Sequence, residues 1–564
     1  MEQSGAEIIV QCLAKAGVRV VAGMPGGANL PLYDALARSG LRHVLVRHEQ
    51  AAGFIAQGMA RTSGGAGVCF ATSGPGATNL VTALADAHRD SVPVVAITGQ
   101  VPTALLGTDA FQEVDTPALV GSIVKRAVQI RRPEELWHEV PAALRLAESG
   151  RPGPVLIDVP KDVQVQSCAR PPDAARAGAD DGAGEGDLSG AVAEAVAYLE
   201  AAERPVVLAG GGLVLGSAHR ELYALSERQD LPVTATLMGL GVLDPDDPRW
   251  LGMLGMHGAP YTNRALREAD LLVVLGARFD DRATGKLAEF CPQARVLHVD
   301  VDARELGKLR RAELAVRADV GVFLRQLLPV LPRRARRRWR ERVAELRHRH
   351  PLPVPADEAT GRPVHLLRAM ADALPADATL TTDVGQHQMW VAQHVPVRRP
   401  RGLLTSGGLG TMGFGLPAAI GSALVRDAPV VCVTGDGSLL LSIAELATLA
   451  ELELDVRIVL FDNRHLGLVR QQQDLFYAGR HSAARFERAV DFVTVARGLG
   501  VSATRVEPGP DSRADLGSAL QRPGPHLIHV PIDPRGHVLP MVPPGAANHE
   551  MLGERATSPR ADGS

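Results

Sequence analysis

The chain has 564 residues, more than one hydrophobic core normally supports, so we expect three or four domains. Its hydrophobic fraction of 46% and charged fraction of 22% are ordinary for a globular protein, and a net charge of -3 argues against a surface for polyanions. No apolar run approaches the roughly 20 residues that span a bilayer. We therefore expect no nucleic-acid partner and no membrane segment.

The five cysteines are scattered, odd in number and lack a C-x-x-C pair, so neither a disulfide framework nor a zinc site is expected. The N-terminus runs directly into a helical pattern through Ala6, Ile9 and Leu13, without the features of a signal peptide. These features predict a reducing, cytoplasmic location.

Residues 1–168 alternate helical stretches with short runs of β-branched residues. This alternation predicts a parallel sheet with helices on both faces. The expected strands are Val18–Ala22, Val44–Arg47, Val68–Ala71, Val94–Thr98 and Val155–Val159. The segment Pro171–Gly190, rich in Ala, Gly, Asp and Pro and without periodicity, is expected to be a linker.

Two further segments, 190–332 and 361–532, show the same alternation, so the predicted fold class is α/β, with three doubly wound domains and mainly parallel sheets. Their expected strands are Val206–Ala209, Leu271–Leu275, Val296–Val301, Leu380–Thr382, Val430–Thr434 and Val456–Phe461. Residues 533–564, rich in Pro, Gly and Ala, are expected to form a tail of loops.

The basic stretch Arg333–Arg349 raises the question of nucleic-acid binding. Its apolar residues Trp339, Val343 and Leu346 have helical spacing, and acidic residues interrupt the run of positive charge. The pattern favours an amphipathic helix with a solvated arginine face.

Two polar motifs follow consecutive expected strands of the third domain. Gly435-Asp436-Gly437-Ser438 comes directly after Val430–Thr434, and Asp462-Asn463 follows the next strand. Because the carboxyl ends of parallel strands meet at one edge of a sheet, we expect the carboxylate and the amide to lie together there. Their oxygens suit Mg2+, and the glycines allow the backbone to approach a diphosphate. For the first motif alone, a simple Asp-Gly turn is the alternative.

This pairing resembles the thiamine-diphosphate binding motif, in which the metal anchors the diphosphate. That family also places a glutamate, usually from another subunit, against the aminopyrimidine ring, where a carboxyl group promotes removal of the thiazolium C2 proton. Glu49, in His48-Glu49-Gln50, opens an Ala/Gly-rich helix and is the candidate. The alternative is a helix N-terminal glutamate that complements the helix dipole.

Longer motifs make the resemblance specific. Segments along nearly the whole chain, in family order and spacing, resemble the large catalytic subunit of acetolactate synthase (acetohydroxyacid synthase). They are Arg47–Gln50, Thr72–Asn79, Gly107–Glu113, Arg151–Pro154, Thr382–Trp390, Ser406–Pro417 and Pro540–Asn548. The resemblance implies a thiamine-diphosphate and magnesium enzyme that decarboxylates pyruvate and ligates the two-carbon unit to a second 2-keto acid. In the family this is the first common step of branched-chain amino acid biosynthesis.

The resemblance also implies roles for the matching residues. Magnesium would be held by Asp436, Asn463 and the backbone oxygen of His465. The positions implied around thiamine diphosphate are Gly26, Pro75, Asn79, Gln386, His387, Met412, Gly437, Ser438, Gly467 and Leu468, with Met412 supporting the bent cofactor. The residues implied in the reaction are Glu49, Phe111, Gln112, Lys161 and Arg282. A site shared between subunits implies a homodimer or homotetramer, and the family allows a small regulatory subunit as a further partner.

The middle segment resembles the FAD-binding part of the biosynthetic synthases, in which the flavin is structural. A glycine run after a strand, such as Gly210–Gly212, can admit a dinucleotide phosphate but is equally typical of a loop. The string Arg278–Arg282 is more specific. The positions implied for FAD are Arg151, Gly211, Gly212, Thr236, Leu237, Gly255, His257, Gly276, Arg278, Asp280, Asp300 and Asp319.

Arg282 is expected to pair with the carboxylate of the second keto acid, since a guanidinium binds carboxylates through two parallel hydrogen bonds. The alternative is a surface ion pair with Asp280 or Asp281.

Three positions depart from the family pattern. Gln472 stands where the family usually carries Trp, and the loss of this apolar wall removes about 1 kcal/mol of contact with the extra methyl of 2-ketobutyrate. Lys125-Arg126 replaces Lys-His, and Leu439–Ser442 replaces a bulkier stretch; both put the range of acceptors in doubt. We expect pyruvate to be preferred as acceptor, with 2-ketobutyrate also used.

Two alternatives stay open. The chain is either a carboligase as above or another thiamine-diphosphate enzyme: a 2-keto-acid decarboxylase, an FAD-using pyruvate oxidase or a carboligase of a specialised pathway. Arg282 and the Gln112 segment favour the carboligase. A non-catalytic homologue is the other alternative, which the presence of Glu49, Asp436 and Asn463 disfavours.

Overall fold

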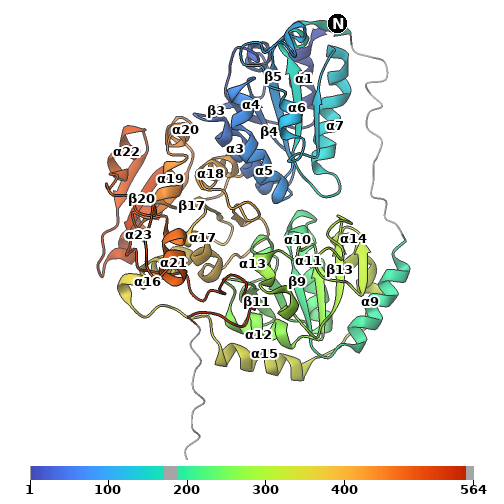
Figure 1. Cartoon of the computed structure of the whole chain (residues 1–564), viewed down its shortest axis with the longest axis vertical. Helices are drawn as coiled ribbons and strands as arrows, with labels where there is room; N and C mark the ends of the chain where they lie inside the picture. The colour runs from blue at the N-terminus through green and yellow to red at the C-terminus, as the bar shows by residue number, and fades with distance from the viewer. Residues whose placement is uncertain (1, 170–186, 554–564) are drawn as a thin grey trace, which may run out of the picture.

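The computed structural model describes residues 2–169 and 187–553, which form three α/β units (Figure 1). The strands of the N-terminal unit are β2 (Val20–Gly23), β3 (Arg42–Leu45), β4 (Gly67–Ala71), β5 (Val94–Gln100), β6 (Arg126–Gln129) and β7 (Val155–Pro160). They form one parallel sheet in the order β3-β2-β4-β5-β7-β6. β4, β5 and β7 are buried at every residue, which explains their unbroken apolar runs.

Helices cover both faces of this sheet. α1 (Gly5–Lys15), α2 (Leu30–Ala37) and α7 (Leu136–Glu148) pack on one face, and α3 (Glu49–Ser63) and α5 (Val81–Arg89) pack on the other. The shorter helices are α4 (Pro75–Asn79), α6 (Thr116–Val120) and α8 (Lys161–Val165). β1 (Glu2–Ser4) pairs antiparallel with β8 (Ser167–Ala169), which joins the two ends of the unit.

The ends of two predicted strands need correction. The strand expected to reach Arg47 ends at Leu45, because Arg47 and His48 already form the turn into α3, where their backbone N–H groups donate to Glu445. The strand expected from Val18 begins at Val20. β6 was not expected, since no residue of this edge strand is fully buried and its pattern carries little signal.

The strands of the central unit are β9 (Pro205–Ala209), β10 (Val233–Ala235), β11 (Trp250–Met253), β12 (Leu271–Leu275), β13 (Arg295–Asp300) and β14 (Leu314–Arg317). They form a parallel sheet in the order β11-β10-β9-β12-β13-β14, the order of doubly wound dinucleotide-binding folds. Its helices are α9 (Ser189–Ala201), α10 (Gly211–Leu215), α11 (His219–Gln229), α12 (Pro260–Glu268), α13 (Asp281–Thr284), α14 (Val320–Val330) and α15 (Arg337–Arg349).

The strands of the C-terminal unit are β15 (Thr379–Thr382), β16 (Leu403–Leu404), β17 (Val430–Gly435), β18 (Val456–Asp462), β19 (Ser502–Arg505) and β20 (His526–Pro531). Their parallel sheet has the order β16-β15-β17-β18-β20-β19, so both terminal units share one strand order, 2-1-3-4-6-5 when strands are counted within each unit. The helices are α16 (Glu358–Ala373), α17 (Gln386–His394), α18 (Gly415–Val425), α19 (Asp436–Leu440), α20 (Glu445–Glu451), α21 (Gly467–Phe476), α22 (Phe492–Gly498) and α23 (Ser512–Leu520). The predicted fold class, three α/β units with parallel sheets, is confirmed.

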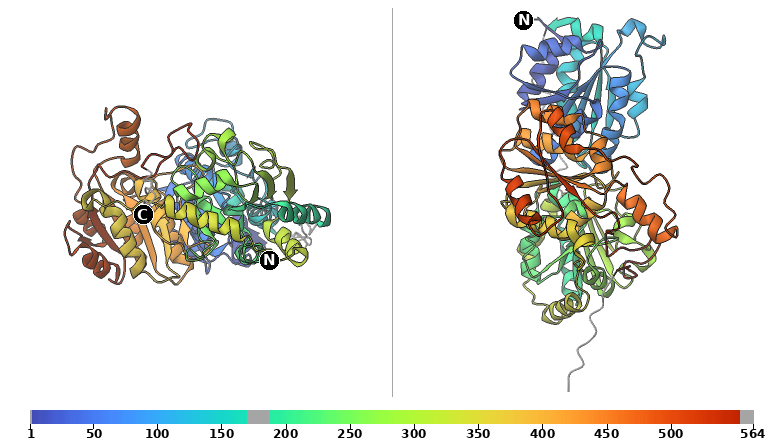
Figure 2. Two further views of the ribbon diagram at one scale, coloured as in Figure 1. Left: turned by 90° about the horizontal axis from the view of Figure 1, so that it is seen from below. Right: turned by 90° about the vertical axis from the view of Figure 1, so that its left-hand side faces the viewer.

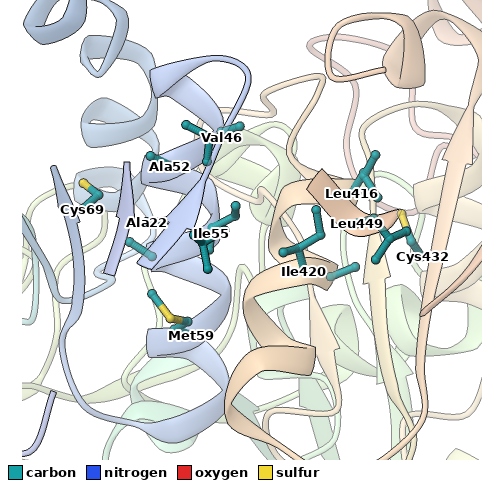
Figure 3. Packing of buried hydrophobic residues seen from close by; sticks show 14 of the residues in the cluster. Ala22, Val46, Ala52, Ile55, Met59, Cys69, Leu416, Ile420, Cys432 and Leu449 are labelled. Carbon is teal, nitrogen blue, oxygen red and sulfur yellow. The ribbon is translucent and has the colours of Figure 1, made fainter. Parts of the chain in front are cut away.

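The two terminal units share one hydrophobic core through α3 and α18 (Figure 3). Ile55 and Met59 of α3 lie opposite Leu416 and Ile420 of α18, and the cluster continues into both sheets. The right-hand view of Figure 2 and Figure 1 both place the N-terminal unit at one end of the molecule.

Two segments outside the predicted ranges pack on the central unit. The predicted amphipathic helix is confirmed as α15, whose Trp339, Val343 and Leu346 enter the core beside α12, so the packing of this unit extends past residue 332. The described part of the tail, residues 533–553, has no helix or strand. Its Val542 N–H donates to the Met256 carbonyl of the central unit, and its Ala546 carbonyl accepts the N–H of Lys286. Most of the predicted linker lies outside the described residues, and α9 already begins at Ser189.

Within the described ranges, no helix is both long enough and apolar enough to cross a membrane.

Candidate active site at the edges of three sheets

The carboxyl edge of the C-terminal sheet collects the residues predicted to bind metal and diphosphate. Gln386 and His387 begin α17 after β15, Asp436 begins α19 after β17, and Asn463 follows β18. Nδ2 of Asn463 donates to Oε1 of Gln386 at 3.3 Å. The strand order reverses between β15 and β17, and open α/β sheets bind ligands in the crevice at such a point.

Asp436 has an unusual environment at this edge. Its Oδ2 is buried and accepts no hydrogen bond from the described residues, and burial together with the neighbouring Asp462 raises the pKa of Asp436 to about 8. A divalent cation would supply the missing partner, and a carboxylate, an amide and a backbone carbonyl suit Mg2+. In the described part of the chain no three His, Cys, Asp or Glu side chains are grouped to hold a metal.

His465 closes a tight turn beside Asn463. Its backbone N–H donates to Oδ1 of Asn463 at 2.9 Å, and its Nδ1 lies 2.7 Å from the Asn463 carbonyl oxygen. The imidazole is therefore engaged locally, and the backbone oxygen is the group that the family resemblance assigns to the metal.

The side chains of Gln386 and His387 are both buried. Nε2 of Gln386 donates to Gln471 at 3.0 Å and to the Gly536 carbonyl at 2.8 Å, so the tail helps to orient it. Burial lowers the pKa of His387 to about 3, and its Nε2 has no partner among the described residues. A neutral imidazole at this place can donate a hydrogen bond to an anionic ligand.

Three other predicted positions lie at the same edge of the sheet. Ser438 uses its hydroxyl to bind the Val384 carbonyl at 2.8 Å, which ties the two loops together. Gly437 packs beside Leu466, and Gly467 packs so closely against Gln386 that a larger residue would overlap it. Leu468 is partly buried and packs against the hydrophobic cluster that also contains Trp390 and Val391 of α17.

Asp383 positions two loops of this edge, but the sequence pattern does not single it out within the motif Thr382–Trp390. It is fully buried, and its carboxylate accepts N–H groups from Val384 at 2.9 Å, Gly413 at 2.8 Å and Gly415 at 3.1 Å. Burial raises its pKa to about 6. Asp383 thus joins the loop of Gln386 to the loop that carries the half-buried Met412.

The carboxyl edge of the N-terminal sheet collects the other half of the predicted site. Glu49 is the first residue of α3, is only 7% exposed, and accepts a hydrogen bond from Nδ2 of Asn79 at 2.9 Å. His48 caps the helix by accepting the N–H of Gln50, so the carboxylate of Glu49 is not needed as a cap. This geometry favours the functional interpretation of Glu49 over the helix-terminus alternative.

The remaining predicted residues of this unit follow other strands of the same sheet. Gly26 follows β2, Pro75 is exposed at the start of α4, and Lys161 is half-buried at the start of α8. In the loop after β5, Gln112 has a positive φ of 61° and Phe111 is 87% exposed. A large aromatic residue on a constrained loop is typical of a surface that another molecule covers.

The two halves are not joined within one chain. Among residues 2–169 and 187–553, no hydrogen bond or ion pair connects Glu49, Phe111 or Gln112 with Asp436, Gln386 or His387.

The central sheet gathers most of the positions predicted for FAD along its carboxyl edge. These positions lie at or just after the ends of all six strands. Gly211 and Gly212 follow β9, Thr236 and Leu237 follow β10, and Gly255 and His257 follow β11. Gly276 and Arg278 follow β12, Asp300 ends β13, and Asp319 follows β14. At the reversal of strand order, the N–H of Gly212 donates to Gly276 at 3.0 Å, and a Cβ on Gly212 would lie 2.7 Å from Cα of Gly276. Close approach of the two loops therefore requires glycine with or without a cofactor.

Several of the FAD positions have contacts of their own. Asp280 caps α13, Asp319 caps α14, and Arg151, which precedes β7, binds Ser91, Asp302 and Glu305 between two units. Burial lowers the pKa of His257 to about 4, and its Nδ1 lies 3.3 Å from the Pro540 oxygen. Burial raises the pKa of Asp300 to about 6. The strand order and the meeting of these loops at one edge support a dinucleotide-binding site more than any one of these residues does.

Comparison with known proteins agrees with this geometry. Three family models match in order: thiamine pyrophosphate enzyme, N-terminal TPP binding domain, at residues 3–119; the central domain at 192–327; and the C-terminal TPP binding domain at 383–530. The acetolactate synthase isozyme 1 large subunit of Escherichia coli is 51% identical, with 98% of each chain covered. The chain belongs to the acetolactate synthase large-subunit family.

Relatives of this family occur in distant organisms. The acetolactate synthase large subunit of Parasynechococcus marenigrum is 47% identical over 98% of this chain and 91% of its own length. The probable acetolactate synthase 2, chloroplastic, of rice is 42% identical over 98% of this chain and 86% of its own length.

Arg282 shows the ion pair that the alternative interpretation predicts. Its Nε lies 3.7 Å from Oδ2 of Asp281, and its side chain is 65% exposed. Such an exposed pair contributes little stability, so it does not prevent Arg282 from binding a carboxylate.

The positions that depart from the family pattern differ in location. Gln472 lies on an exposed face of α21 with Val469 and Phe476, after β18 and on the edge that carries Asn463. Lys125, by contrast, precedes β6 at the opposite edge, where its Nζ donates to the Ser149 carbonyl at 2.7 Å. Lys125 thereby holds the C-terminal end of α7, and Arg126 pairs with Glu139 in the first turn of that helix. These contacts favour a structural role for the pair, and its expected effect on the range of acceptors stays a prediction.

Leu439–Ser442 lies directly after the turn that carries Asp436. Leu439 is buried in the core shared with the N-terminal unit, and Leu441 is exposed. This departure stays a candidate for altered acceptor range.

Proposed function

We propose that the chain is the catalytic subunit of an acetolactate synthase that ligates the two-carbon unit of pyruvate to a second 2-keto acid. The observation that carries the proposal is the pair of matching sheet edges, one with the buried carboxyl of Glu49 and the other with the buried Oδ2 of Asp436, which has no hydrogen-bond partner among the described residues. Bound thiamine diphosphate supplies a nucleophilic carbon and an electron sink for decarboxylation.

Each half of the site has a task that its contacts support. Asp436, Asn463 and the backbone oxygen of His465 hold Mg2+, and Gln386 and His387 bind diphosphate oxygens. Glu49, buried and oriented by Asn79, would hold a proton at the pyrimidine ring. The half-buried Met412 supports the cofactor from the loop after β16.

The acceptor side is formed by exposed residues. Arg282 binds the carboxylate of the second keto acid, and Phe111, Gln112 and Lys161 cover the reacting groups. Gln472 offers no flat apolar wall, which supports pyruvate as the preferred acceptor.

A second copy of the chain is the proposed partner at both edges. Large exposed apolar residues follow the strands there, namely Leu30, Leu105, Phe111, Leu409, Leu441 and Val469. A homodimer, or a homotetramer built from it, covers these residues and brings Glu49 of one copy to Asp436 of the other. The words "large subunit" in the names of the relatives support a smaller regulatory partner as well.

FAD is proposed at the reversal of strand order in the central sheet, beside Gly212, Gly276 and Arg278. Cys69, Cys168, Cys291 and Cys432 are buried and form no disulfide, which supports a reducing, cytoplasmic location.

The test is product analysis of the purified chain with pyruvate, thiamine diphosphate, Mg2+ and FAD. Acetolactate is the expected product. Acetaldehyde, or acetyl phosphate with peroxide, would instead identify a decarboxylase or an oxidase.

Glu49→Gln is the variant that tests the assigned proton holder. We expect at least a 100-fold loss of turnover with unchanged circular dichroism and flavin content, because the amide cannot share a proton with the ring. Glu451→Gln, an exposed residue paired with Arg47 near the same turn, is the control that should keep its activity.

A further inference from the structure

The loop 405–414 between β16 and α18 carries Met412, and its own sequence does little to restrict its backbone conformation. Four of its ten residues are glycines, and two of them have positive φ, Gly410 at 68° and Gly413 at 89°. Glycine-rich backbone loses much conformational freedom on ordering, so the conformation of this loop must come from contacts outside it.

Asp90, at the C-terminal end of α5 in the N-terminal unit, supplies the first of these contacts. Its two carboxylate oxygens accept the N–H groups of Gly407 at 2.9 Å and Gly408 at 2.7 Å. Arg61 of α3 donates to the same carboxylate at 2.8 Å, and the Asp90 side chain is completely buried.

Asp86, one turn earlier on α5, supplies the second. Its Oδ2 accepts hydrogen bonds from the hydroxyls of Ser406 and of Thr411, the latter at 2.7 Å. The hydroxyl of Ser406 in turn accepts the N–H of Thr411 at 2.8 Å. Both ends of the segment before Met412 are therefore fixed by Asp86, while Asp383 fixes Gly413 on the other side.

The arrangement is reciprocal between the two terminal units. Glu445 of α20, in the C-terminal unit, accepts the N–H groups of Arg47 at 2.9 Å and His48 at 3.1 Å, immediately before Glu49. α5 and α20 have the same place in the shared strand order, between the third and fourth strands. Each unit thus uses a buried carboxylate to hold the strand-to-helix turn of the other.

Burying two carboxylates with one guanidinium has a large desolvation cost, which the attraction between the charges does not fully offset. Burial and the nearby Asp90 raise the pKa of Asp86, which reflects the same unfavourable environment. Apolar residues would stabilise this junction more simply, but they cannot fix the direction of backbone N–H groups.

We propose that Asp86 and Asp90 are positioning residues that hold the loop 405–414 in the conformation that binds the thiamine cofactor. The proposal rests on the proposed function of Met412. It predicts that weakening the carboxylates loosens this loop and the binding of cofactor without altering the binding of keto acid.

Asp90→Asn is the principal variant, because an amide can accept at only one of its two atoms and so turns a donor toward Gly407 or Gly408. Hydrogen exchange of the peptide 405–414 in the full chain should become at least tenfold faster. The half-saturating concentration of thiamine diphosphate, followed by tryptophan fluorescence with Mg2+ present, should rise at least tenfold. The KM for pyruvate should change less than twofold.

Three further variants make the result specific. Thr411→Val removes a single hydroxyl, so hydrogen exchange at 405–414 and the half-saturating concentration of thiamine diphosphate should each rise about threefold. Glu445→Gln should speed exchange at residues 46–49 but not at 405–414. Asp34→Asn, an exposed carboxylate paired with Arg38, should change neither quantity.

The proposal is overturned if exchange at 405–414 is unchanged in Asp90→Asn, or if it rises while the cofactor requirement stays the same. If Asp90→Asn loosens the whole chain, Thr411→Val decides, and wild-type behaviour of that variant overturns the proposal. Cofactor binding by fluorescence needs no turnover, so failure to form acetolactate would overturn the proposed function and leave this result separate.

Discussion

Buried carboxylates at the strand ends of this chain fall into two kinds. Asp158 lies on β7, the strand between β5 and β6 in the sheet. It accepts hydrogen bonds from Thr98 at 2.6 Å, Gln100 at 3.0 Å and Gln129 at 3.1 Å. Oδ2 of Asp436 is buried but has no such donor in the described chain. The surroundings, rather than the residue type, separate a carboxylate that the protein satisfies from one whose oxygen is left without a donor.

Asp158 should make stability depend on pH. Burial raises its pKa from 3.8 to about 6, so the folded chain binds this proton more tightly than the unfolded chain does. Its contribution is therefore greatest below pH 4 and is lost between pH 4 and 6, by about 3 kcal/mol. In urea unfolding from pH 4.5 to 7.5, wild type should lose stability relative to Asp158→Asn, whose amide does not titrate. A difference that is constant with pH would contradict this assignment.

Gln472→Trp should shift the choice of acceptor toward 2-ketobutyrate. The indole restores an apolar wall for the extra methyl, and about 1 kcal/mol corresponds to about a fivefold rise in the ratio of the larger product to acetolactate. The measurement is a competition between pyruvate and 2-ketobutyrate. Gln472→Leu should give an intermediate ratio, and an unchanged ratio in both variants would place Gln472 outside the acceptor pocket.

At the scale of elements, the crossing of α3 and α18 determines how the terminal units meet. Gly58 of α3 lies against the backbone of Ala418, and Gly421 of α18 lies against the backbone of Ile55, so a Cβ at either glycine would overlap a carbonyl oxygen. Thr62 also donates a hydrogen bond to Ser422 at 3.0 Å across the crossing. The short distance between the helix backbones depends on these two glycines.

Gly58→Ala and Gly421→Ala should therefore destabilise the chain by about 1–3 kcal/mol, because overpacking outweighs the higher helix propensity of alanine. Gly517→Ala in α23 is the matched control, since no atom lies within 4 Å of its Cβ position. It should be stabilised by up to about 1 kcal/mol. Thermal unfolding of the three variants measures both effects, and equal shifts for all three would refute the close crossing.

At the scale of the whole molecule, the two halves of the site belong to different units. Among the described residues, no hydrogen bond or ion pair links Glu49, Phe111 or Gln112 directly to Asp436, Gln386 or His387. If two copies share their sites, a mixture of Glu49→Gln and Asp436→Asn chains forms heterodimers with one site that is intact and one that carries both substitutions. Such heterodimers should restore activity up to about a quarter of the wild-type value, although each variant alone is nearly inactive. Activity measured after mixing and reassembly tests this, and no recovery would place each site within a single chain.

Much of the fold was predictable because its strongest signals are local. Buried strands such as Val430–Gly435 are continuous apolar runs, and polar motifs placed directly after them must lie on one edge of a parallel sheet. The positions of Asp436, Asn463 and Glu49 at the sheet edges could therefore be predicted from the sequence. The half-exposed edge strands β6 and β14 were missed, and so were the interior strands β10 and β20, which are buried but short or interrupted by histidines.

The sequence by itself determined the alternation of strands and helices and the residues that follow each strand, since both depend on neighbours within a few positions. The tertiary structure alone decided which distant segments hold those residues in place. Asp90 binds Gly407 across 317 positions, Glu445 binds Arg47 across 398, and the tail orients Gln386 through Gly536. No periodicity records such contacts, because they exist only in the folded chain; the first two also require α3 and α18 to pack and bring the two terminal sheets together.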